Sequence, residues 1–143
     1  MNTLTAQHPS ARILVVDDNA TNLMLLTEVL RLAGFQTVKA FSHPADVIPY
    51  MRHNQIDVLL VDQSMPDMTG LELYLRIKIE LGYCPISFLV TAQSMGDLAE
   101  RAKSIGMQGF ISKPFNIRQV VRDIDEAITA RGDDSTATNS VEE

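Results

Sequence analysis

A chain of 143 residues with a net charge of −6 suits one domain with its own core, since this length buries roughly two thirds of the unfolded surface. Its one cysteine, Cys84, excludes an intrachain disulfide and fits a reducing, cytoplasmic setting. The acidic balance argues against direct nucleic-acid binding, which needs a basic surface. No apolar run approaches the ~20 residues of a membrane span, so we expect no membrane partner.

Five runs of strand-forming residues follow one another along the chain. They are Arg12–Val16, Gln36–Ala40, Val58–Val61, Ile86–Val90 and Gly109–Ile111. Fully apolar stretches such as ILVV and VLLV are typical of strands buried on both faces of a parallel sheet. The first, third and fourth runs are the most apolar, which predicts that they lie at the centre of the sheet.

Helical patterns separate and follow these runs. The predicted helices cover residues 23–33, 44–53, 69–81, 98–105 and 117–128. Pro44 suits a first turn, whereas Pro49 inside the second predicted helix indicates a kink or a late start. Alternation of strands and helices predicts an α/β domain with a parallel sheet.

The two ends of the chain differ in composition from the middle. Residues 1–11 are predicted to form a polar N-terminal arm, and residues 12–129 the domain itself. Residues 130–143 are small, polar and acidic, and half of the net negative charge falls within 131–143. This composition predicts a disordered acidic tail or the start of a linker.

Polar residues stand where four of the apolar runs end. Asp17 and Asp18 follow the first run, Asp62 the third, Thr91 the fourth and Lys113 the fifth. Right-handed crossovers bring the carboxyl ends of parallel strands to one edge, where the ligands of such sheets bind. We therefore expect three carboxylates, a hydroxyl and an amine to lie close together.

Such a set of side chains has a specific chemistry. Clustered carboxylates repel one another, and burial raises their pKa values further, so a cation is expected among them. Oxygen ligands with open positions for water and a phosphate describe a Mg²⁺ site. A carboxylate can also attack phosphorus and form an aspartyl phosphate. Lys113 and Thr91 could then bind the phosphoryl oxygens, whose charge must be neutralised in the transition state.

Each of these residues has an ordinary interpretation when taken singly. Asp17 and Asp18 could cap the helix that follows, and Asp62 could belong to a turn. Thr91 could be a strand-end hydroxyl and Lys113 a surface amine. Their joint occurrence at the ends of successive strands favours the phosphoryl-transfer interpretation.

The motifs LVVDDN, VDQSMPDMTGLEL, VTAQ and FISKPF, in this order, are similar to those of the receiver domains of two-component response regulators. The similarity extends over about residues 11–129. It implies a flavodoxin-like (βα)₅ fold, a doubly wound parallel five-stranded sheet in the order 2-1-3-4-5. It also implies a phosphoprotein that takes a phosphoryl group from a histidine kinase or a histidine phosphotransfer protein and signals to a partner or output domain.

The resemblance assigns roles to the acidic residues. It implies that Asp62 is the phosphoacceptor and that Asp17 and Asp18 bind Mg²⁺. Asp62 and the backbone carbonyl of Ser64 would complete the protein ligands of the metal. Such a signalling switch is not an enzyme in the ordinary sense, because it catalyses only its own phosphorylation and dephosphorylation.

The resemblance also implies a conformational switch. Thr91 and Lys113 match the residues that bind the phosphoryl group, and Phe110 matches an aromatic switch position that would act together with Thr91. Taken alone, Phe110 would be a core residue. The face formed by the fourth helix, the fifth strand and the fifth helix is expected to change. Ser64 and Gln93 match positions that tune the lifetime of the phosphate, and the Lys-Pro bond at position 113 is expected to be cis.

Other functions stay open at this point. A module that keeps the receiver shape without phosphorylation would be expected to lose one of the acidic residues or the lysine, and none is lost. The pattern Asp17-Asp18-Asn19…Asn22 is frequent in receivers of hybrid kinases, so the chain could be part of a larger protein, although Met1 and the polar arm favour a natural start. A metabolic phosphatase with an aspartate nucleophile would need a general acid two residues after Asp62. Ser64 stands at that position, which argues against this class of enzyme. The sequence leaves a homodimer open.

Overall fold

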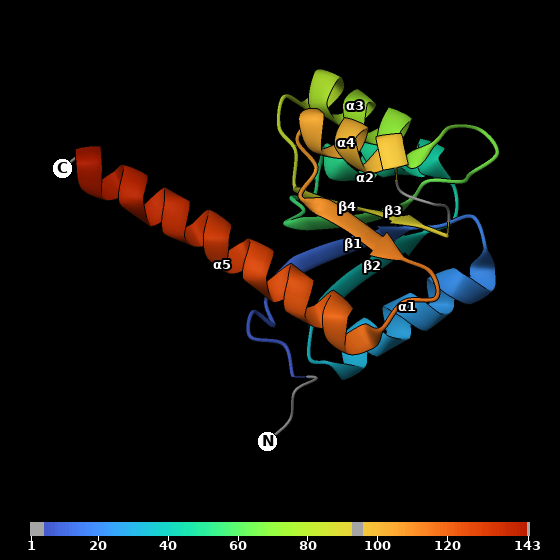
Figure 1. Ribbon diagram of the computed structural model, residues 1–143, viewed down its shortest axis with the longest axis horizontal. Coiled ribbons are helices and arrows are strands. Elements are labelled where there is room, and N and C mark those ends of the chain that lie inside the picture. Colours follow the sequence, from blue (N-terminus) through green and yellow to red (C-terminus); the bar gives the residue numbers. More distant parts are fainter. Residues whose placement is uncertain (1–4, 93–95, 143) are drawn as a thin grey trace.

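Five parallel strands form one sheet in the computed structural model, which describes residues 5–92 and 96–142 (Figure 1). The strands are β1 (Arg12–Val16), β2 (Thr37–Phe41), β3 (Val58–Asp62), β4 (Ile86–Thr91) and β5 (Gly109–Ser112). Their order is β2-β1-β3-β4-β5, and every neighbouring pair is parallel. The predicted fold class and the central positions of the first, third and fourth runs are confirmed.

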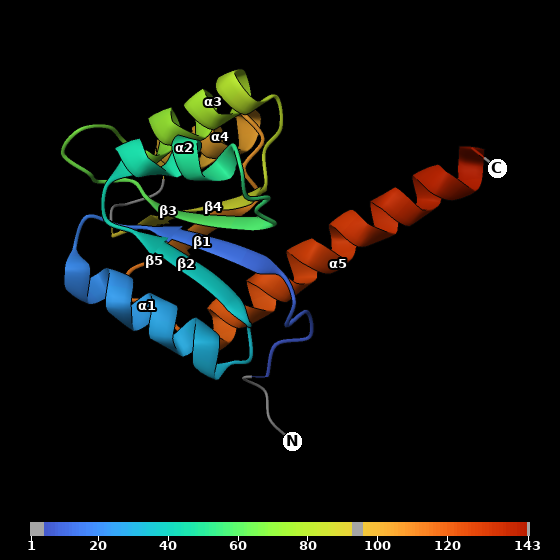
Figure 2. The same cartoon turned by 180° about the vertical axis from the view of Figure 1, so that it is seen from behind.

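Helices cover both faces of this sheet (Figures 1 and 2). They are α1 (Ala20–Leu32), the 3₁₀ turn η1 (Pro44–Asp46), α2 (Val47–Met51), α3 (Gly70–Leu81), α4 (Gly96–Ser104) and α5 (Ile117–Glu142). The helices α1 and α5 lie on one face, and α2, α3 and α4 lie on the other. In the part of the chain that the structure describes, no helix combines the length and apolarity that crossing a bilayer requires.

Each central strand contributes to two cores, because successive side chains of a strand point to opposite faces. Ile13 and Val15 of β1 belong to the core beneath α1 and α5. Leu14 and Val16 belong to the core beneath α2, α3 and α4. All four side chains are at most 1% exposed. Burial on both faces explains why these strands read as continuous apolar runs rather than as an alternating pattern.

The late start expected around Pro49 is confirmed. The chain first forms the η1 turn, and α2 begins at Val47. Pro49 therefore lies in the first turn of α2, where a backbone N–H has no partner within the helix. The predicted helix over 44–53 becomes a 3₁₀ turn followed by a short α-helix.

The helix α5 extends into residues 130–143, for which the sequence predicts a disordered acidic tail or the start of a linker. The structure continues α5 to Glu142, and its C-terminal part extends away from the sheet (Figures 1 and 2). Extending a helix that is already packed over Ile117–Ile128 avoids the unfavourable nucleation step, and no proline interrupts the segment. The interpretation of residues 130–143 as a disordered tail or the start of a linker stays a prediction.

The N-terminal arm is attached to α5 by hydrogen bonds. The backbone N–H groups of Gln7 and His8 donate to the Asp125 carboxylate at 2.9 and 3.2 Å. The His8 ring also lies 2.8 Å from the Thr129 hydroxyl. Asp125 is only 5% exposed, so its carboxylate depends on these donors for the hydrogen bonds it loses from water.

Replacing Asp125 should therefore loosen the arm. We expect Asp125→Ala to lower the free energy of unfolding by about 1–3 kcal/mol, because two backbone N–H groups lose their acceptor. Asp123→Ala is the matched control, since Asp123 on the same helix accepts a hydrogen bond from the side chain of Gln119 and, among the described residues, from no backbone N–H group. Urea unfolding of both variants checks the prediction, and an equal loss in the two would contradict it.

Candidate functional site

Three carboxylates meet at the carboxyl edge of the central strands. Asp17 follows β1, and Asp62 is the last residue of β3. Because Val16 and Val61 are paired in the register of these two strands, the residues that follow them lie side by side. One carboxylate oxygen each of Asp17, Asp18 and Asp62 lies within 4.8 Å of the other two. The structure thus brings together the three acidic residues predicted from the sequence.

Burial differs among the three carboxylates. Asp17 and Asp62 are 5% and 4% exposed, whereas Asp18 is exposed. The alternative of a capping role is resolved, because Asn19 is the N-cap of α1 and its side chain accepts the Asn22 N–H at 2.9 Å. Asp17 in turn accepts the backbone N–H of Asn19 at 2.9 Å, which orients its carboxylate.

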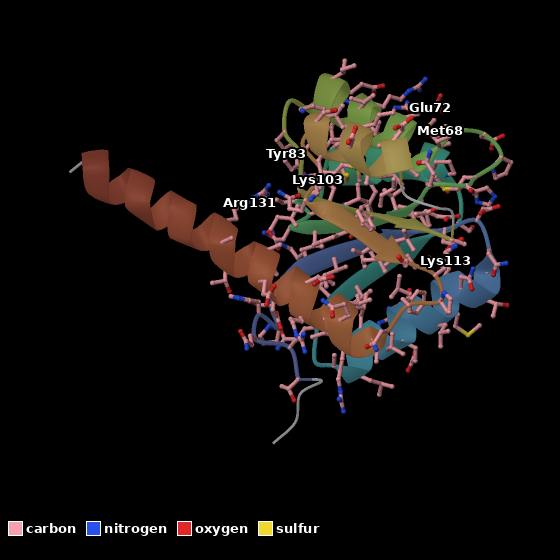
Figure 3. All side chains as sticks on the ribbon, in the orientation of Figure 1. Met68, Glu72, Tyr83, Lys103, Lys113 and Arg131 are labelled. Atoms are coloured by element: carbon pink, nitrogen blue, oxygen red, sulfur yellow. The ribbon has the colours of Figure 1, made fainter. Side chains whose placement is uncertain are left out.

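Lys113 reaches two of these carboxylates from beyond β5. Its Nζ lies 3.2 Å from Oδ1 of Asp62 and 3.3 Å from Oδ2 of Asp17. Its backbone N–H donates to the carbonyl of Thr91 at 2.9 Å, which ties the segment after β5 to the end of β4. The bond between Lys113 and Pro114 is cis, as predicted. Figure 3 shows Lys113 at the carboxyl edge of the sheet.

The electrostatics of the cluster are unbalanced. Burial raises the pKa of Asp62, and the charge of Asp17 raises it further, while Lys113 and the Ser64 N–H offset only part of this increase. Burial lowers the pKa of Lys113, but the hydrogen bond to Asp62 and the charge of Asp17 outweigh it and raise that pKa. One ammonium faces three carboxylates, and this hard oxygen donor set fits a divalent cation such as Mg²⁺.

Thr91 and Phe110 occupy the neighbouring strands. Thr91 ends β4 at the same edge and is 2% exposed. Phe110 lies in β5, is partly buried, and packs against the core beneath α2, α3 and α4. Ser64 is exposed, two residues beyond Asp62. Gln93 lies outside the described residues. The structure therefore brings Thr91 and Lys113 to the carboxyl edge, whereas the ligand role of the Ser64 carbonyl and the switch role of Phe110 stay predictions.

Gly70 is a site residue that the sequence interpretation did not find. A Cβ atom there would lie 2.7 Å from the carbonyl oxygen of Asp62 and 2.7 Å from Cδ1 of Leu89. The Gly70 N–H also donates to the carbonyl of Gln63 at 3.3 Å. The start of α3 is thus packed directly against the backbone of Asp62, where only glycine fits. No local pattern could reveal this, because Leu89 is distant in the sequence.

The fold and the arrangement at its carboxyl edge are those of a receiver domain. The family model of the response regulator receiver domain matches residues 13–125, and the chain therefore belongs to this family. It is 30% identical over 122 residues to the chemotaxis protein CheY of Pseudomonas aeruginosa, which covers 84% of this chain and 97% of that protein. The chain is thus a receiver domain of two-component signalling.

Other relatives are much longer than this chain. The DNA-binding transcriptional regulator NtrC of Proteus hauseri is 36% identical over 80% of the chain, which spans 24% of that protein. The virulence sensor protein BvgS of Bordetella pertussis is 35% identical over 83% of the chain, which spans only 10% of it. The similarity therefore covers only a small part of each of these two proteins.

Solved structures agree with the fold. A receiver domain protein from Clostridium thermocellum is 26% identical, with a TM-score of 0.76, and the match covers 85% of this chain and 97% of that one. A CheY-like protein from Methanospirillum hungatei is 24% identical with a TM-score of 0.78, covering 87% of this chain and 98% of that one. The second similarity supports the fold alone.

Proposed function

We propose that this receiver domain accepts a phosphoryl group on Asp62 from a histidine kinase or a histidine phosphotransfer protein. The observation that carries the proposal is the Lys113 ammonium, which lies within 3.3 Å of both Asp17 and Asp62 at the edge where Asp18 and Thr91 also lie. A nucleophile and a cation for the transferred group are thus next to each other.

The chemistry follows from these positions. A carboxylate oxygen of Asp62 attacks phosphorus, the P–N bond of the donor phosphohistidine breaks, and its electron pair stays on the imidazole nitrogen. Lys113 and the Thr91 hydroxyl hold the phosphoryl oxygens. Asp17, Asp18, Asp62 and the Ser64 carbonyl would hold Mg²⁺, which supplies positive charge against the phosphoryl oxygens when bound. Water later attacks phosphorus, the bond from phosphorus to the Asp62 oxygen breaks, and inorganic phosphate leaves while the carboxylate is restored. We expect the chain to act on no other substrate.

Signalling would follow from the added charge. The phosphorylated Asp62 side chain carries about −1.5 to −2 charge in place of the single charge of the carboxylate, a net gain of about −0.5 to −1, and it brings new acceptor oxygens. Thr91 would move toward the phosphate, and Phe110 would turn inward into the vacated space. The surface formed by α4, β5 and α5 would then change its conformation, and a partner or an output domain would bind it differently. Neither the output partner nor a homodimer follows from the residues, and a cytoplasmic location stays a prediction from the sequence.

Asp62→Asn tests the acceptor assignment. We expect this variant to take up no label from a radioactive small phosphodonor such as acetyl phosphate in the presence of Mg²⁺, because an amide is a poor nucleophile. Asp67→Asn is the control, since it removes an exposed carboxylate from the loop that follows Asp62. Labelling of Asp62→Asn at the rate of the unmodified protein would show that the acceptor lies elsewhere.

Asp18→Asn tests the metal site separately. We expect Mg²⁺ affinity to fall by at least about tenfold, since one of three charged oxygen ligands is lost. Asp18 is exposed, so the substitution should leave the free energy of unfolding nearly unchanged. Isothermal titration with Mg²⁺ measures the change, again with Asp67→Asn as control. Unchanged affinity in Asp18→Asn would remove this residue from the ligand set.

A further inference from the structure

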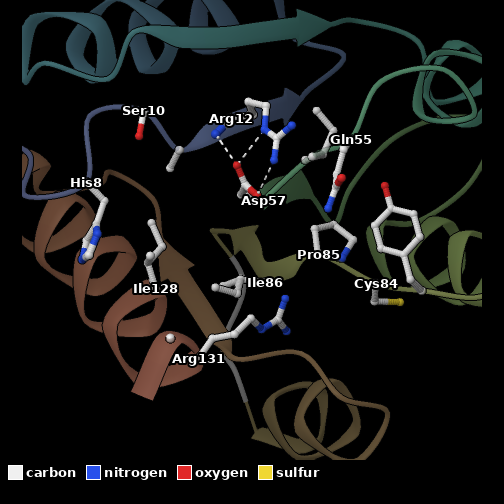
Figure 4. A pocket seen from close by; sticks show the side chains of 14 residues that line it. His8, Ser10, Arg12, Gln55, Asp57, Cys84, Pro85, Ile86, Ile128 and Arg131 are labelled. Atoms are coloured by element: carbon white, nitrogen blue, oxygen red, sulfur yellow. Dashed lines mark hydrogen bonds and ion pairs between the residues drawn. The ribbon is translucent and has the colours of Figure 1, made fainter. Parts of the chain in front are cut away.

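A pocket of about 500 Å³ opens at the amino-terminal edge of the sheet, opposite the acidic cluster (Figure 4). Arg12 at the start of β1, Asp57 just before β3 and Ile86 at the start of β4 line it. Ile128 and Arg131 of α5 form the wall on the other side. Its volume lies within the roughly 300–1,000 Å³ typical of small-molecule sites.

One part of the pocket is apolar. Ile56, Pro85 and Ile86 contribute from the segments that lead into β3 and β4, and Ile128 contributes from α5. Ile56 and Ile86 are only 3% and 2% exposed and are fixed by the surrounding core, so the partly exposed Ile128 offers more apolar surface to a ligand than either of them. A rigid apolar surface beside a few polar groups is the arrangement that binds the body of an organic ligand.

The polar part carries a net positive charge within a chain whose net charge is −6. Arg12 and Asp57 neutralise each other through Nε–Oδ2 and Nη2–Oδ1 contacts of 2.9 and 3.1 Å. Burial raises the pKa of Asp57, but the hydrogen bonds and the charge of Arg12 outweigh it and keep the pKa below its ordinary value. The Asp57 carboxylate thus stays ionised and paired with the guanidinium of Arg12.

The charge of Arg131 also acts on Asp57 and helps to lower its pKa, but Arg131 makes no direct contact with that carboxylate like that of Arg12. Among the described residues, no hydrogen bond or ion pair of its guanidinium is found, although the side chain reaches from α5 to a position beside Ile86 (Figure 4). In Figure 3 it lies at the end of the sheet opposite Lys113. A guanidinium next to an apolar wall recognises a carboxylate, sulfonate or phosphate attached to an apolar body.

We propose that this pocket binds a small organic anion with an apolar body. Its charged group contacts Arg131, and its body packs on the partly exposed Ile128. The proposal is independent of phosphorylation, because the pocket shares no residue with the cluster of Asp17, Asp18 and Asp62.

Two fluorescent probes of similar shape separate charge from apolar contact. Anilinonaphthalene sulfonate carries one negative charge, and phenylnaphthylamine has the same rings without it. We expect the protein to bind the anionic probe about tenfold more tightly than the neutral one. If neither probe binds, or if both bind equally, the proposal is wrong.

Substitutions then locate the binding. Arg131→Gln should remove the preference for the anionic probe, while the control Arg122→Gln, which changes the same charge at an exposed position of α5 outside the pocket, should keep it. Ile128→Ala should weaken the binding of both probes by the same factor, about three- to tenfold. Amide NMR shifts of Ile86 and Ile128 should follow the titration. The assignment would be overturned if Arg131→Gln kept the preference for the anionic probe, or if Arg122→Gln lost it to the same extent. Unchanged binding of both probes to Ile128→Ala would also overturn it.

Discussion

Lys113→Met should be about 2–4 kcal/mol less stable than the unmodified protein at about pH 8 without divalent cations, and much closer to it at about pH 5. The Lys113 ammonium contacts Asp17 and Asp62, and both carboxylates are at most 5% exposed. Methionine keeps much of the apolar stem of the side chain but leaves the two buried charges facing each other. Breaking a buried ion pair on one side is costly for this reason.

The pH dependence follows from the direction of the Asp62 pKa. Burial and Asp17 already raise this pKa, and loss of Lys113 removes the contact that lowers it. Between the ordinary value and the raised value the folded state binds more protons than the unfolded state, so stability falls as pH rises through that window. The deficit of the variant is therefore largest above the window and becomes much smaller below it.

Urea unfolding at the two pH values measures this effect. Lys103→Met is the matched control, because Lys103 is an exposed residue of α4 away from the cluster. Added Mg²⁺ should restore part of the stability of Lys113→Met if the three carboxylates bind it, since a ligand that binds only the folded state stabilises it. An equal deficit at both pH values would show that packing of the stem, rather than charge, is what the substitution removes.

Gly70→Ala should destabilise the protein by about 1–3 kcal/mol and slow phosphoryl uptake on Asp62. At a helical position with open space around it, replacing glycine by alanine stabilises the helix by roughly 0.5–1 kcal/mol. Here the added Cβ would approach the Asp62 carbonyl oxygen and Leu89 Cδ1 to 2.7 Å, which real atoms do not tolerate. Either α3 or the backbone of Asp62 must move.

Gly132→Ala is the control for this substitution. Gly132 lies within α5, and a Cβ there meets nothing within 4 Å, so its stability should be unchanged or slightly higher. Urea unfolding and the rate of labelling from a phosphodonor check both variants. If Gly70→Ala were as stable as Gly132→Ala and labelled normally, the close packing of α3 on Asp62 would not matter for the site.

The parts of the fold that follow local patterns were predictable from the sequence. Runs such as VLLV indicate strands that are buried on both faces. Asp62 directly follows one of them, which predicts that it lies at the carboxyl edge of the sheet. The same reasoning brought Lys113 to the acidic cluster, since a lysine that follows a parallel strand must lie at that edge. Local sequence and sheet geometry were sufficient here.

Features that depend on distant contacts were not predictable in this way. The packing of Gly70 on Leu89 and the attachment of Gln7 and His8 to Asp125 join segments far apart in the chain. The extension of α5 beyond residue 130 is a feature that composition alone does not give. A polar, acidic composition predicts that a segment buries little surface, but it does not exclude a helix that continues from a packed neighbour.

The long α5 helix has a mechanical consequence. Its first part is packed against the sheet up to Ile128, and about 14 further residues reach Glu142, a length of ~20 Å at 1.5 Å per residue. The distal part of such a helix moves as a lever, so a tilt of ~10° at the packed base displaces its far end by ~3–4 Å. A rearrangement too small to alter the core could thus be transmitted well beyond the surface of the domain.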